Sequence, residues 1–456
     1  MSSLQTAINA RTSSNLLQLA SAQSRSQVLK RIKIVLEKHK EQIFEANLED
    51  IAYAQKEVEA GRLSQSLFKR LDIKGENEAK FETMLKGIDE IDMLEDPIGR
   101  ISMHRELDEG LVLKRVSCPV GVLLVIFEAR PEVVVNIACL SIKSANAAIL
   151  KGGKEASKTN RVLADLIKQA ILSVLDENSS SNNDCPEFPI NAIQLVDTRD
   201  EIHELLQLEK YIDLAIPRGS NALVKYVQNN TRIPVLGHAD GLCSIYIDQN
   251  CDINKAAKIV VDAKTDYPAA CNSVETLLVH ADSLSECFPA VAKALIDSKV
   301  VLHLDSKSKS ALLDSGIDFN TNASYIVDAV PEDYNTEFLS LELAVKVVSN
   351  IEEAITHINT HGSKHTDCII TSVESNGEYF MNKVDAAGVY MNASTRFADG
   401  FRYGFGAEVG VSTNKTHARG PVGLEGLTIY KYKLYGIGQA ASEYGPGKKQ
   451  YTHRDF

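Results

Sequence analysis

Apolar residues recur at intervals of three and four through the first hundred residues of the chain. In the clearest stretch they stand at Val28, Leu29, Ile32, Val35 and Leu36, with charged residues between them. Residues at this spacing share one face of a helix, so the pattern predicts amphipathic helices. A second such stretch lies around residue 85. Nothing in either stretch indicates chemistry, and residues 1–100 are predicted to form a helical layer.

The pattern changes beyond residue 116. Residues 120–127 are apolar at almost every position, which is typical of a strand buried on both faces. A helical pattern covers 156–175, and shorter strand-like runs lie at 147–150, 192–196 and 212–216. Strands that alternate with helices predict a parallel sheet covered on both sides. The polar segment 177–184 is predicted to be a surface loop within this series.

A second alternating series starts near Cys243. Its predicted strands are 243–247, 275–279, 300–303, 343–348 and 368–371, with helical patterns such as 290–296 and 352–358 between them. Two successive series place the chain in the α/β class and predict two doubly wound α/β domains with a cleft between them. Residues 101–116 and 428–434 are strand-like as well.

Composition narrows the classes of function. The chain has 456 residues, of which 44% are hydrophobic and 24% charged, as in ordinary globular proteins of more than one domain. Its formal net charge is −12 and it has no basic stripe. This balance argues against a nucleic-acid partner, because phosphate binding needs clustered Lys and Arg. No apolar run is long enough to cross a bilayer, so no membrane partner is expected.

Cysteine usage and the start of the chain bear on the compartment. The eight cysteines are scattered, and none forms a Cys-x-x-Cys pair, which favours a reducing compartment. The first twenty residues lack the apolar core of a signal peptide. They are Ser-rich and contain Arg11, as transit peptides do, but they fit better as the start of the helical layer. A cytoplasmic location is therefore predicted.

Three loops carry residues suited to binding or catalysis. Lys151-Gly-Gly-Lys154 follows a predicted strand and precedes a helix. Its glycines allow close backbone approach and its lysines attract phosphate, although a solvated turn would look the same. Pro217-Arg-Gly-Ser220 lies in the same context and either presents backbone N–H groups to a pyrophosphate or caps a helix at Ser220.

The third loop, 266–273, holds Cys271 among small residues and beside Asn272. An exposed thiol in such a loop is a candidate nucleophile. Most cysteines are nevertheless buried structural residues, so Cys271 alone does not establish catalysis.

Two further patterns are rejected. The glycines at 404, 406 and 410 resemble a dinucleotide-binding fingerprint, but the last spacing is one residue too long and no apolar strand precedes them. His357, His361 and His365 recur at intervals of four, as on one face of a metal-binding helix. Gly362 and Ser363 are expected to end that helix, and no acidic or Cys ligand stands at metal spacing. No metal site is predicted.

Taken together, these segments resemble the aldehyde dehydrogenase superfamily over residues 119–438. Pro119-Val-Gly-Val122 is similar to the superfamily's opening strand. Four other segments are similar to its glutamate-5-semialdehyde dehydrogenase family: 127–131 (Phe-Glu-Ala-Arg-Pro), 348–369 with its histidines, 392–397 (Asn-Ala-Ser-Thr-Arg-Phe) and 417–421 (His-Ala-Arg-Gly-Pro). This resemblance accounts for the histidines without a metal.

The resemblance implies a domain plan and residue roles. Residues 1–100 and 117–243 would form the cofactor-binding domain, 244–425 the catalytic domain with the nucleophile Cys271, and 101–116 with 426–440 the strands of a small β-flap for oligomer contact. The cofactor-binding residues would be Lys151 at the adenosine ribose, Gly153 and Lys154 in the same loop, Gly219 and Ser220 at the pyrophosphate, and Glu342 at the nicotinamide ribose.

Three departures from the superfamily's pattern refine these roles. NAD-preferring relatives often carry a glutamate where this chain has Lys154, and lysine attracts a 2′-phosphate, so NADPH is the expected cofactor. Hydrolytic relatives carry a water-activating glutamate where this chain has Val235, so its thioester is expected to exchange with phosphate instead of water. The Asn of the oxyanion hole has no clean counterpart. The Cys271 backbone N–H is a reasonable donor, and its partner is either Asn136 or Arg130.

The implied reaction is the NADPH-dependent reduction of L-glutamyl 5-phosphate to L-glutamate 5-semialdehyde through a thioester on Cys271, the second step of proline biosynthesis from glutamate. The doubly anionic substrate needs basic side chains, and Arg130, Arg396 and Arg419 are candidates, with structural salt bridges as the equal alternative. A homo-oligomer and a separate glutamate 5-kinase are the expected partners. The alternatives are a hydrolytic or CoA-acylating aldehyde dehydrogenase and a non-catalytic member of the superfamily.

Overall fold

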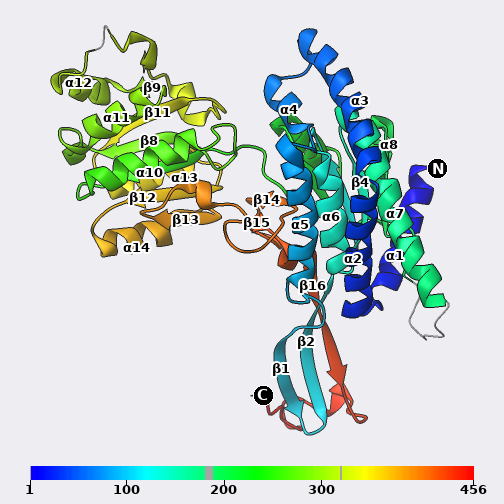
Figure 1. Ribbon diagram of the computed structural model, residues 1–456. Helices are drawn as coiled ribbons and strands as arrows, with labels where there is room; N and C mark the ends of the chain where they lie inside the picture. The colour runs from blue at the N-terminus through cyan, green and yellow to red at the C-terminus, as the bar shows by residue number, and fades with distance from the viewer. Residues whose placement is uncertain (1, 180–187, 319–320) are drawn as a thin grey trace. The chain divides into compact units, whose positions relative to one another are not determined.

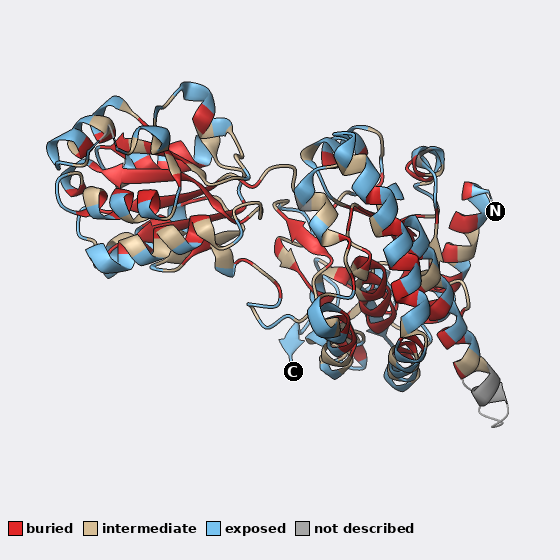
Figure 2. Cartoon of the chain, turned by 45° about the horizontal axis from the view of Figure 1, so that its top comes forward, coloured by how far each residue is buried: buried red, intermediate tan, exposed pale blue. Residues whose placement is uncertain are grey.

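The computed structural model describes residues 2–179, 188–318 and 321–456, and the chain divides into two compact units. The first unit comprises Met1–Leu236, Phe405–Gly410 and Val422–Phe456, and the second comprises Gly237–Gly404 and Val411–Pro421. The division falls at Leu236, before the predicted limit at residue 243, and a short segment at 405–410 returns to the first unit. Each unit has its own buried strands, which Figure 2 shows in red.

The first unit begins with the helical layer that its apolar spacing predicts. The helices are α1 (Ser3–Leu17), α2 (Ala22–Lys38), α3 (Lys40–Glu59), α4 (Gln65–Arg70) and α5 (Ala79–Met93). The residues at the helical spacing of α2, among them Val28, Ile32 and Leu36, are all buried. The apolar face of α2 thus packs inward and its charged face meets solvent.

A four-stranded parallel sheet in the order β5-β4-β3-β6 forms the core of this unit. Its strands are β3 (Val122–Phe127), β4 (Ala147–Lys151), β5 (Ile193–Leu195) and β6 (Leu214–Arg218). The helices between and after them are α6 (Glu132–Lys143), α7 (Ser157–Ser179), α8 (Arg199–Leu205) and α9 (Asn221–Asn229). All four strands lie within or beside their predicted ranges. Of the predicted surface loop 177–184, residues 177–179 belong to α7 and the rest lie outside the described residues.

The second unit holds a seven-stranded sheet in the order β10-β9-β11-β8-β7-β12-β13, and every pair in it is parallel. Its strands are β7 (Cys243–Ile247), β8 (Val274–His280), β9 (Val301–Leu304), β10 (Ile326–Asp328), β11 (Glu342–Val348), β12 (Thr366–Ile370) and β13 (Gly388–Met391). The helices are α10 (Ile253–Thr265), α11 (Cys287–Asp297), α12 (Ser306–Asp314), α13 (Ile351–His361) and α14 (Glu374–Lys383). The fold prediction of two α/β sheets is confirmed.

The two short edge strands, β10 and β13, were not predicted from the sequence. β10 has three residues and β13 has four, and none of their side chains is fully buried. A strand at a sheet edge has one exposed side, so its composition lacks the continuous apolar run that marks a central strand. By contrast, the five strands and two helices predicted in this unit all coincide with observed elements, and the limits of β7 match residue for residue.

A separate antiparallel sheet has the order β16-β2-β1-β17. It consists of β1 (Ile101–Asp108), β2 (Leu111–Pro119), β16 (Thr428–Tyr435) and β17 (Arg454–Asp455). The predicted strand-like stretch 101–116 is a hairpin that turns at Gly110, whose φ of 70° favours glycine. This sheet, called the flap below, projects from the helices of the first unit (Figure 1). A further two-stranded sheet pairs β14 (Gly410–Ser412) with β15 (Gly420–Val422).

Among the residues that the structure describes, no helix is both long and apolar enough to cross a lipid bilayer.

Candidate active site

Cys271 lies in the loop that connects α10 to β8, and its side chain is partly exposed. The loop turns tightly, since Ala270 N–H donates to the Tyr267 carbonyl at 3.0 Å and Ser273 N–H donates to the Ala270 carbonyl at 2.9 Å. Tyr267 adopts a left-handed conformation with φ of 64°, which a bulky residue adopts only where its surroundings enforce it. The thiol is therefore presented by a constrained loop.

The position of this loop differs from that of the other two predicted loops. The loops after Lys151 and after Arg218 follow β4 and β6, at the carboxyl ends of parallel strands, where α/β sheets usually bind ligands. Cys271 instead precedes β8, at the amino end of its strand. The loops before β7 and β12 lie at the same edge of the second sheet, because their strands are parallel to β8 or to its neighbour. These loops bring further residues to Cys271.

A buried ion pair closes the base of the Cys271 loop. Lys264, near the end of α10, lies 2.6 Å from the Glu275 carboxylate at the start of β8, and also donates to the Val274 carbonyl at 3.0 Å. Both side chains are almost fully buried. Burial raises the pKa of Glu275 to about 7 and lowers the pKa of Lys264, while each charge partly offsets the shift of the other. The pair fixes the distance between the two ends of the loop.

Arg396 holds the same loop from the side. Its guanidinium donates to the Asp266 carbonyl and to the Asn272 side-chain oxygen, on either side of Cys271. Arg402 adds an ion pair to Asp266 at 2.8 Å. Arg396 was predicted either to bind substrate or to make a structural contact, and the contacts that it makes here hold the Cys271 loop in position.

The loop before β7 approaches the backbone of Cys271 closely at Gly241. A Cβ at this position would stand 2.6 Å from the Cys271 Cα and would overlap the Cys271 carbonyl oxygen. The Gly241 N–H donates to the Glu337 carboxylate at 3.0 Å. Only glycine permits this approach, and His238, three residues earlier in the same loop, lies near the thiol.

Two histidines flank Cys271. One nitrogen of His238, one nitrogen of His365 and the Cys271 sulfur all lie within 4.8 Å of one another. The two imidazole rings meet edge to face, with centroids 4.9 Å apart and an interplanar angle of 78°. His365 follows the end of α13 and precedes β12, so it does not share a helix face with His357 and His361, as expected from Gly362. His238 was not singled out from the sequence, because no local pattern surrounds it.

In the first unit, the loop Lys151-Gly-Gly-Lys154 borders a pocket of about 530 Å³. Gly152, Gly153 and Lys154 line it together with Ser157, Asn160 and Arg161. A Cβ on Gly152 would overlap the Asn160 amide. The pocket thus depends on the glycine at that position, and Lys154 stands exposed at it.

Two carboxylates tie the loops at the carboxyl ends of β4, β3 and β6 together. Glu155 accepts from the Ala129 N–H at 2.7 Å, and Glu128 accepts from the Ser220 N–H at 2.9 Å. Ala129 is buried and left-handed, with φ of 43°. Ser220 is the residue before α9, and its side chain makes no capping hydrogen bond. Ser220 is thus the N-cap residue of α9 by position, without a capping hydrogen bond from its side chain, and its backbone N–H donates to a carboxylate.

The remaining predicted residues lie as follows. Asn136 is on α6, where its side-chain oxygen is 3.9 Å from the place of a Cβ on Gly87, and Arg130 precedes α6 and is half-buried. Glu342, at the start of β11, accepts from Ser340 at 2.6 Å and contacts His303 at 3.3 Å. Val235 forms a bridge to Ala215 beside β6.

Arg419 belongs to a cluster of cations around Asp385. Arg419, Lys364 and Lys415 lie 3.0, 3.4 and 2.7 Å from this one carboxylate. Hydrogen bonds from Lys415 and Arg419 lower the pKa of Asp385 to about 2. The cluster carries a surplus of positive charge in an acidic protein, which suits it to an anionic ligand.

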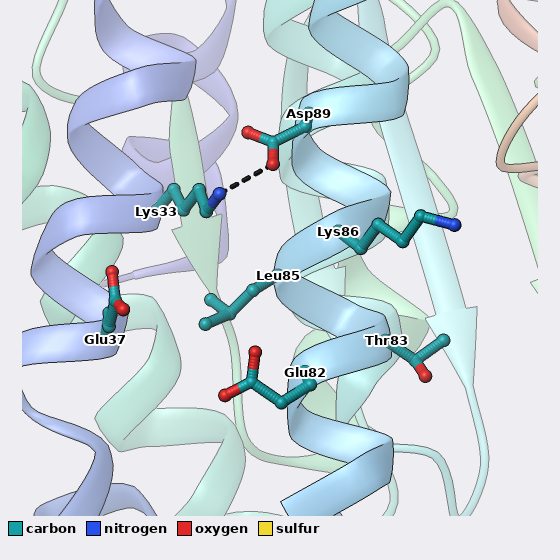
Figure 3. Close-up of a pocket in the computed structure, with 7 residues that line it drawn as sticks. All are labelled: Lys33, Glu37, Glu82, Thr83, Leu85, Lys86 and Asp89. Atoms are coloured by element: carbon teal, nitrogen blue, oxygen red, sulfur yellow. Dashed lines mark hydrogen bonds and ion pairs between the residues drawn. The ribbon is translucent and has the colours of Figure 1, made fainter.

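A further pocket, of about 420 Å³, contains none of the predicted site residues. It lies between α2 and α5, and the ion pair between Lys33 and Asp89 spans it at 2.6 Å (Figure 3). Its lining is mostly charged, with Glu37, Glu82 and Lys86, as expected of a solvated groove between two amphipathic helices.

Comparisons with known proteins agree with this architecture. The model of the aldehyde dehydrogenase family matches residues 4–338. A protein of Schizosaccharomyces pombe described as a probable gamma-glutamyl phosphate reductase is 50% identical over 447 residues, covering 97% of this chain and 95% of its own length. The gamma-glutamyl phosphate reductase of Saccharomyces cerevisiae is 50% identical over 463 residues, with 100% and 98% covered.

A solved structure extends the likeness to three dimensions. The crystal structure of gamma-glutamyl phosphate reductase from Thermotoga maritima has a TM-score of 0.87 and 33% sequence identity, and covers 96% of this chain and 100% of its own. The family match covers more than half of the chain, and the relatives match it nearly end to end. The chain therefore belongs to the aldehyde dehydrogenase family of oxidoreductases and, within it, to the group of the gamma-glutamyl phosphate reductases.

Proposed function

We propose that the protein reduces L-glutamyl 5-phosphate to L-glutamate 5-semialdehyde with NADPH and releases phosphate, as the second step of proline biosynthesis from glutamate. The observation that carries the proposal is the 50% sequence identity, over essentially the full chain, to relatives named for this substrate. The partly exposed Cys271 in its constrained loop supports it, because thiol catalysis needs an accessible and fixed nucleophile.

Cys271 is the residue that carries the acyl group. Its sulfur attacks the γ-acyl carbon, a carbon–sulfur bond forms, and phosphate leaves with the electron pair of the broken carbon–oxygen bond. NADPH, when bound, supplies the hydride that reduces the resulting thioester. The sulfur then leaves the reduced carbon, and the aldehyde departs. The Cys271 backbone N–H is the proposed donor to the oxyanion of these steps, with Asn136 or Arg130 as its proposed partner.

Exclusion of water explains why an acyl phosphate suits this chain. Val235 cannot activate water, and its neighbours Pro234 and Leu236 are hydrogen-bonded through their backbones to Ala215. Without a water-activating carboxylate at position 235, the proposed thioester persists until hydride or phosphate reaches it.

The residues of the first unit fit a nicotinamide dinucleotide. The pocket beside Lys151 and Lys154 lies at the carboxyl end of β4, where doubly wound sheets bind such cofactors. The Ser220 N–H at the start of α9 already donates to one anion, the Glu128 carboxylate, and is therefore suited to a pyrophosphate. Glu155, the carboxylate nearest to Lys154 in sequence, is engaged with the Ala129 N–H, and two carboxylates that line the pocket, Glu49 and Asp197, are paired with Lys158 and Arg161. These features favour NADPH over NADH. Glu342 is the proposed contact for the nicotinamide ribose.

The substrate's anionic groups require the basic side chains of the second unit. The cluster of Arg419, Lys364 and Lys415 supplies surplus positive charge and is the proposed contact for phosphate or carboxylate. Arg396, held by Asp266 and Asn272, is proposed instead to position the Cys271 loop. Arg130 remains a proposed substrate contact.

The reverse reaction tests the proposal most directly. Glutamate 5-semialdehyde should reduce NADP⁺ only when phosphate or arsenate is present, and the Cys271→Ser variant should be inactive. Activity without phosphate would indicate a hydrolytic enzyme, and activity only with coenzyme A would indicate an acylating one. No activity of the wild type with any of these acceptors would indicate a non-catalytic member of the family.

We also propose that the protein forms a homo-oligomer through the flap. Strand β16 is an edge of this sheet and exposes large apolar side chains, including Tyr432 and Leu434. Exposed apolar edge strands are sites of strand or face pairing between chains. A separate glutamate 5-kinase is the proposed source of the unstable acyl phosphate.

A further inference from the structure

The two histidines beside Cys271 have different surroundings. His238 is half-buried, and its Nδ1 donates to the Val411 carbonyl oxygen at 3.1 Å. Because a carbonyl only accepts, Nδ1 carries the proton, and Nε2 of the neutral ring carries the lone pair. An imidazole oriented in this way by an acceptor behind it is arranged as a general base is.

His365 is almost completely buried, at 1% exposure. Its Nδ1 lies 2.9 Å from the Thr366 hydroxyl, and its Nε2 has no hydrogen-bond partner among the described residues. Because a hydroxyl can donate or accept, the contact with Thr366 does not fix which ring nitrogen carries the proton, unlike the carbonyl acceptor of His238. His365 packs edge to face against His238, so its contribution is to hold the other ring in place.

Glu337 lies where it would stabilise a charge on His238. Its carboxylate accepts from Gly241, three residues after His238, at 3.0 Å. Burial raises the pKa of Glu337, and a charge on His238 offsets part of this rise. A carboxylate near an imidazole favours the imidazolium that forms when the ring takes a proton.

Other titratable groups lie around the thiol. Cys243 approaches the Cys271 carbonyl at 3.4 Å, and burial holds the pKa of its own thiol well above the usual value, so it stays protonated. Asp240 lies near Glu337, whose pKa it raises. Lys264 and Glu275 form an ion pair at the base of the loop. Asp367 is buried and accepts a hydrogen bond from the Ser244 N–H. Among the His, Cys, Asp and Glu side chains in the part of the chain that the structure describes, His238 and His365 form the cluster with the Cys271 sulfur.

We propose that His238 is the proton acceptor of the Cys271 thiol and that His365 is a positioning residue for His238. This inference deepens the proposed function and rests on it for the reaction steps. The proton passes from Sγ to Nε2 of His238 as the carbon–sulfur bond forms and phosphate leaves with its electron pair. When the aldehyde departs, the electron pair of the carbon–sulfur bond returns to sulfur, and the proton returns from His238.

The test measures the alkylation of Cys271 by iodoacetamide between pH 6 and 9, with quantification of the Cys271 peptide by mass spectrometry. The wild-type rate should level off at a pH below the ordinary thiol range, which lies around 8.5. His238→Asn should shift the profile upward by about one pH unit and lower the rate at pH 7 roughly tenfold. His365→Asn should lower the rate with a smaller shift of the profile.

His357→Asn is the matched control, since His357 is a buried histidine on α13 outside the cluster, and its profile should equal that of the wild type. The proposal is overturned if His238→Asn keeps the wild-type profile, or if His365→Asn shows the larger shift. Should His238→Asn not fold, the wild type decides alone: a profile that rises through pH 8.5 like a free thiol contradicts the proposal. Alkylation needs neither substrate nor cofactor, so a failure of the proposed reduction in the assay above leaves this result separately readable.

Discussion

At the scale of single residues, Lys154 is the side chain on which the proposed cofactor preference depends. It is exposed at the pocket beside Gly152 and Gly153. Lys154→Glu should place a negative charge near the negatively charged 2′-phosphate of NADPH. The ratio of kcat/KM for NADPH to kcat/KM for NADH should therefore fall roughly tenfold or more, which corresponds to about 1.4 kcal/mol. Steady-state kinetics with both nicotinamides measure this ratio. Lys168→Glu, an equal charge change at an exposed position of α7, should leave it unaltered.

Asp367 gives a residue-scale prediction for stability. It is 1% exposed, and burial raises its pKa to about 7 although it accepts from Ser244 N–H at 2.8 Å. The unfolded chain titrates this carboxyl near 4, so the folded protein binds the extra proton between these values. The contribution of Asp367 is thus most favourable below pH 4 and is lost as the pH rises through 7.

Asp367→Asn retains the acceptor and removes the charge. The wild type should therefore lose about 2–3 kcal/mol more stability than this variant between pH 5 and pH 8, as measured by urea unfolding. Asp385→Asn serves as the control, because Asp385, with a pKa of about 2, stays ionised throughout this range. Parallel pH dependence of the wild type and Asp367→Asn would show that the carboxyl is ionised at both pH values.

The residue scale is also where sequence analysis had least to work with. Cys271, Lys154 and Glu342 were predicted as site residues because family motifs surround them, whereas the sequence did not indicate the contacts of His238 and Glu128. Their partners Cys271 and Ser220 are distant in sequence, and only the folded backbone makes them neighbours. Gly241 likewise looks like any loop glycine until the Cys271 backbone is seen against it.

At the scale of elements, the ion pair of Lys264 on α10 with Glu275 on β8 fixes the two ends of the Cys271 loop. Glu275→Gln should leave the Lys264 ammonium buried without a counter-charge, and should cost roughly 3–5 kcal/mol of unfolding free energy. Denaturant titration measures this cost. Asp297→Asn breaks the exposed pair with Lys293 on α11 and should cost less than about 1 kcal/mol. Equal effects of the two changes would mean that Lys264 loses its proton without cost.

Element boundaries followed from the sequence where burial was uniform. β7 and β11 are central strands, covered on both faces, and their apolar runs match their observed limits to within a residue. The sequence did not predict at which edge of the sheet Cys271 lies. A strand pattern has no direction of its own, so the position of the thiol before β8 rather than after a strand became clear only with the topology.

At the scale of the whole molecule, the flap carries the prediction about assembly. In β16, Tyr430, Tyr432 and Leu434 alternate with lysines and so share one face. The double change Tyr432→Glu with Leu434→Glu should lower the molar mass measured by light scattering to that of the monomer. Lys431→Glu with Lys433→Glu, on the opposite face of the same strand, should not. A monomeric wild type would remove the proposed role of the flap.

The division into two α/β units was predictable because the strand–helix alternation restarts near Cys243. The return of residues 405–410 and 422–456 to the first unit was not, since these segments contain few regular elements. Their membership rests on long-range pairing, such as that of β16 with β2.

The hydrogen bond from Ser220 to Glu128 has a consequence for how a cofactor enters. A pyrophosphate that takes this N–H displaces the protein's own carboxylate, so binding is an exchange of one anion for another. With the proposed pyrophosphate contact, the tethered carboxylate would compete at a fixed effective concentration, and would therefore weaken cofactor affinity by a constant factor and speed release of the oxidised cofactor. Turnover would then gain from a side chain that never touches the reacting atoms, because it resets the site after every cycle.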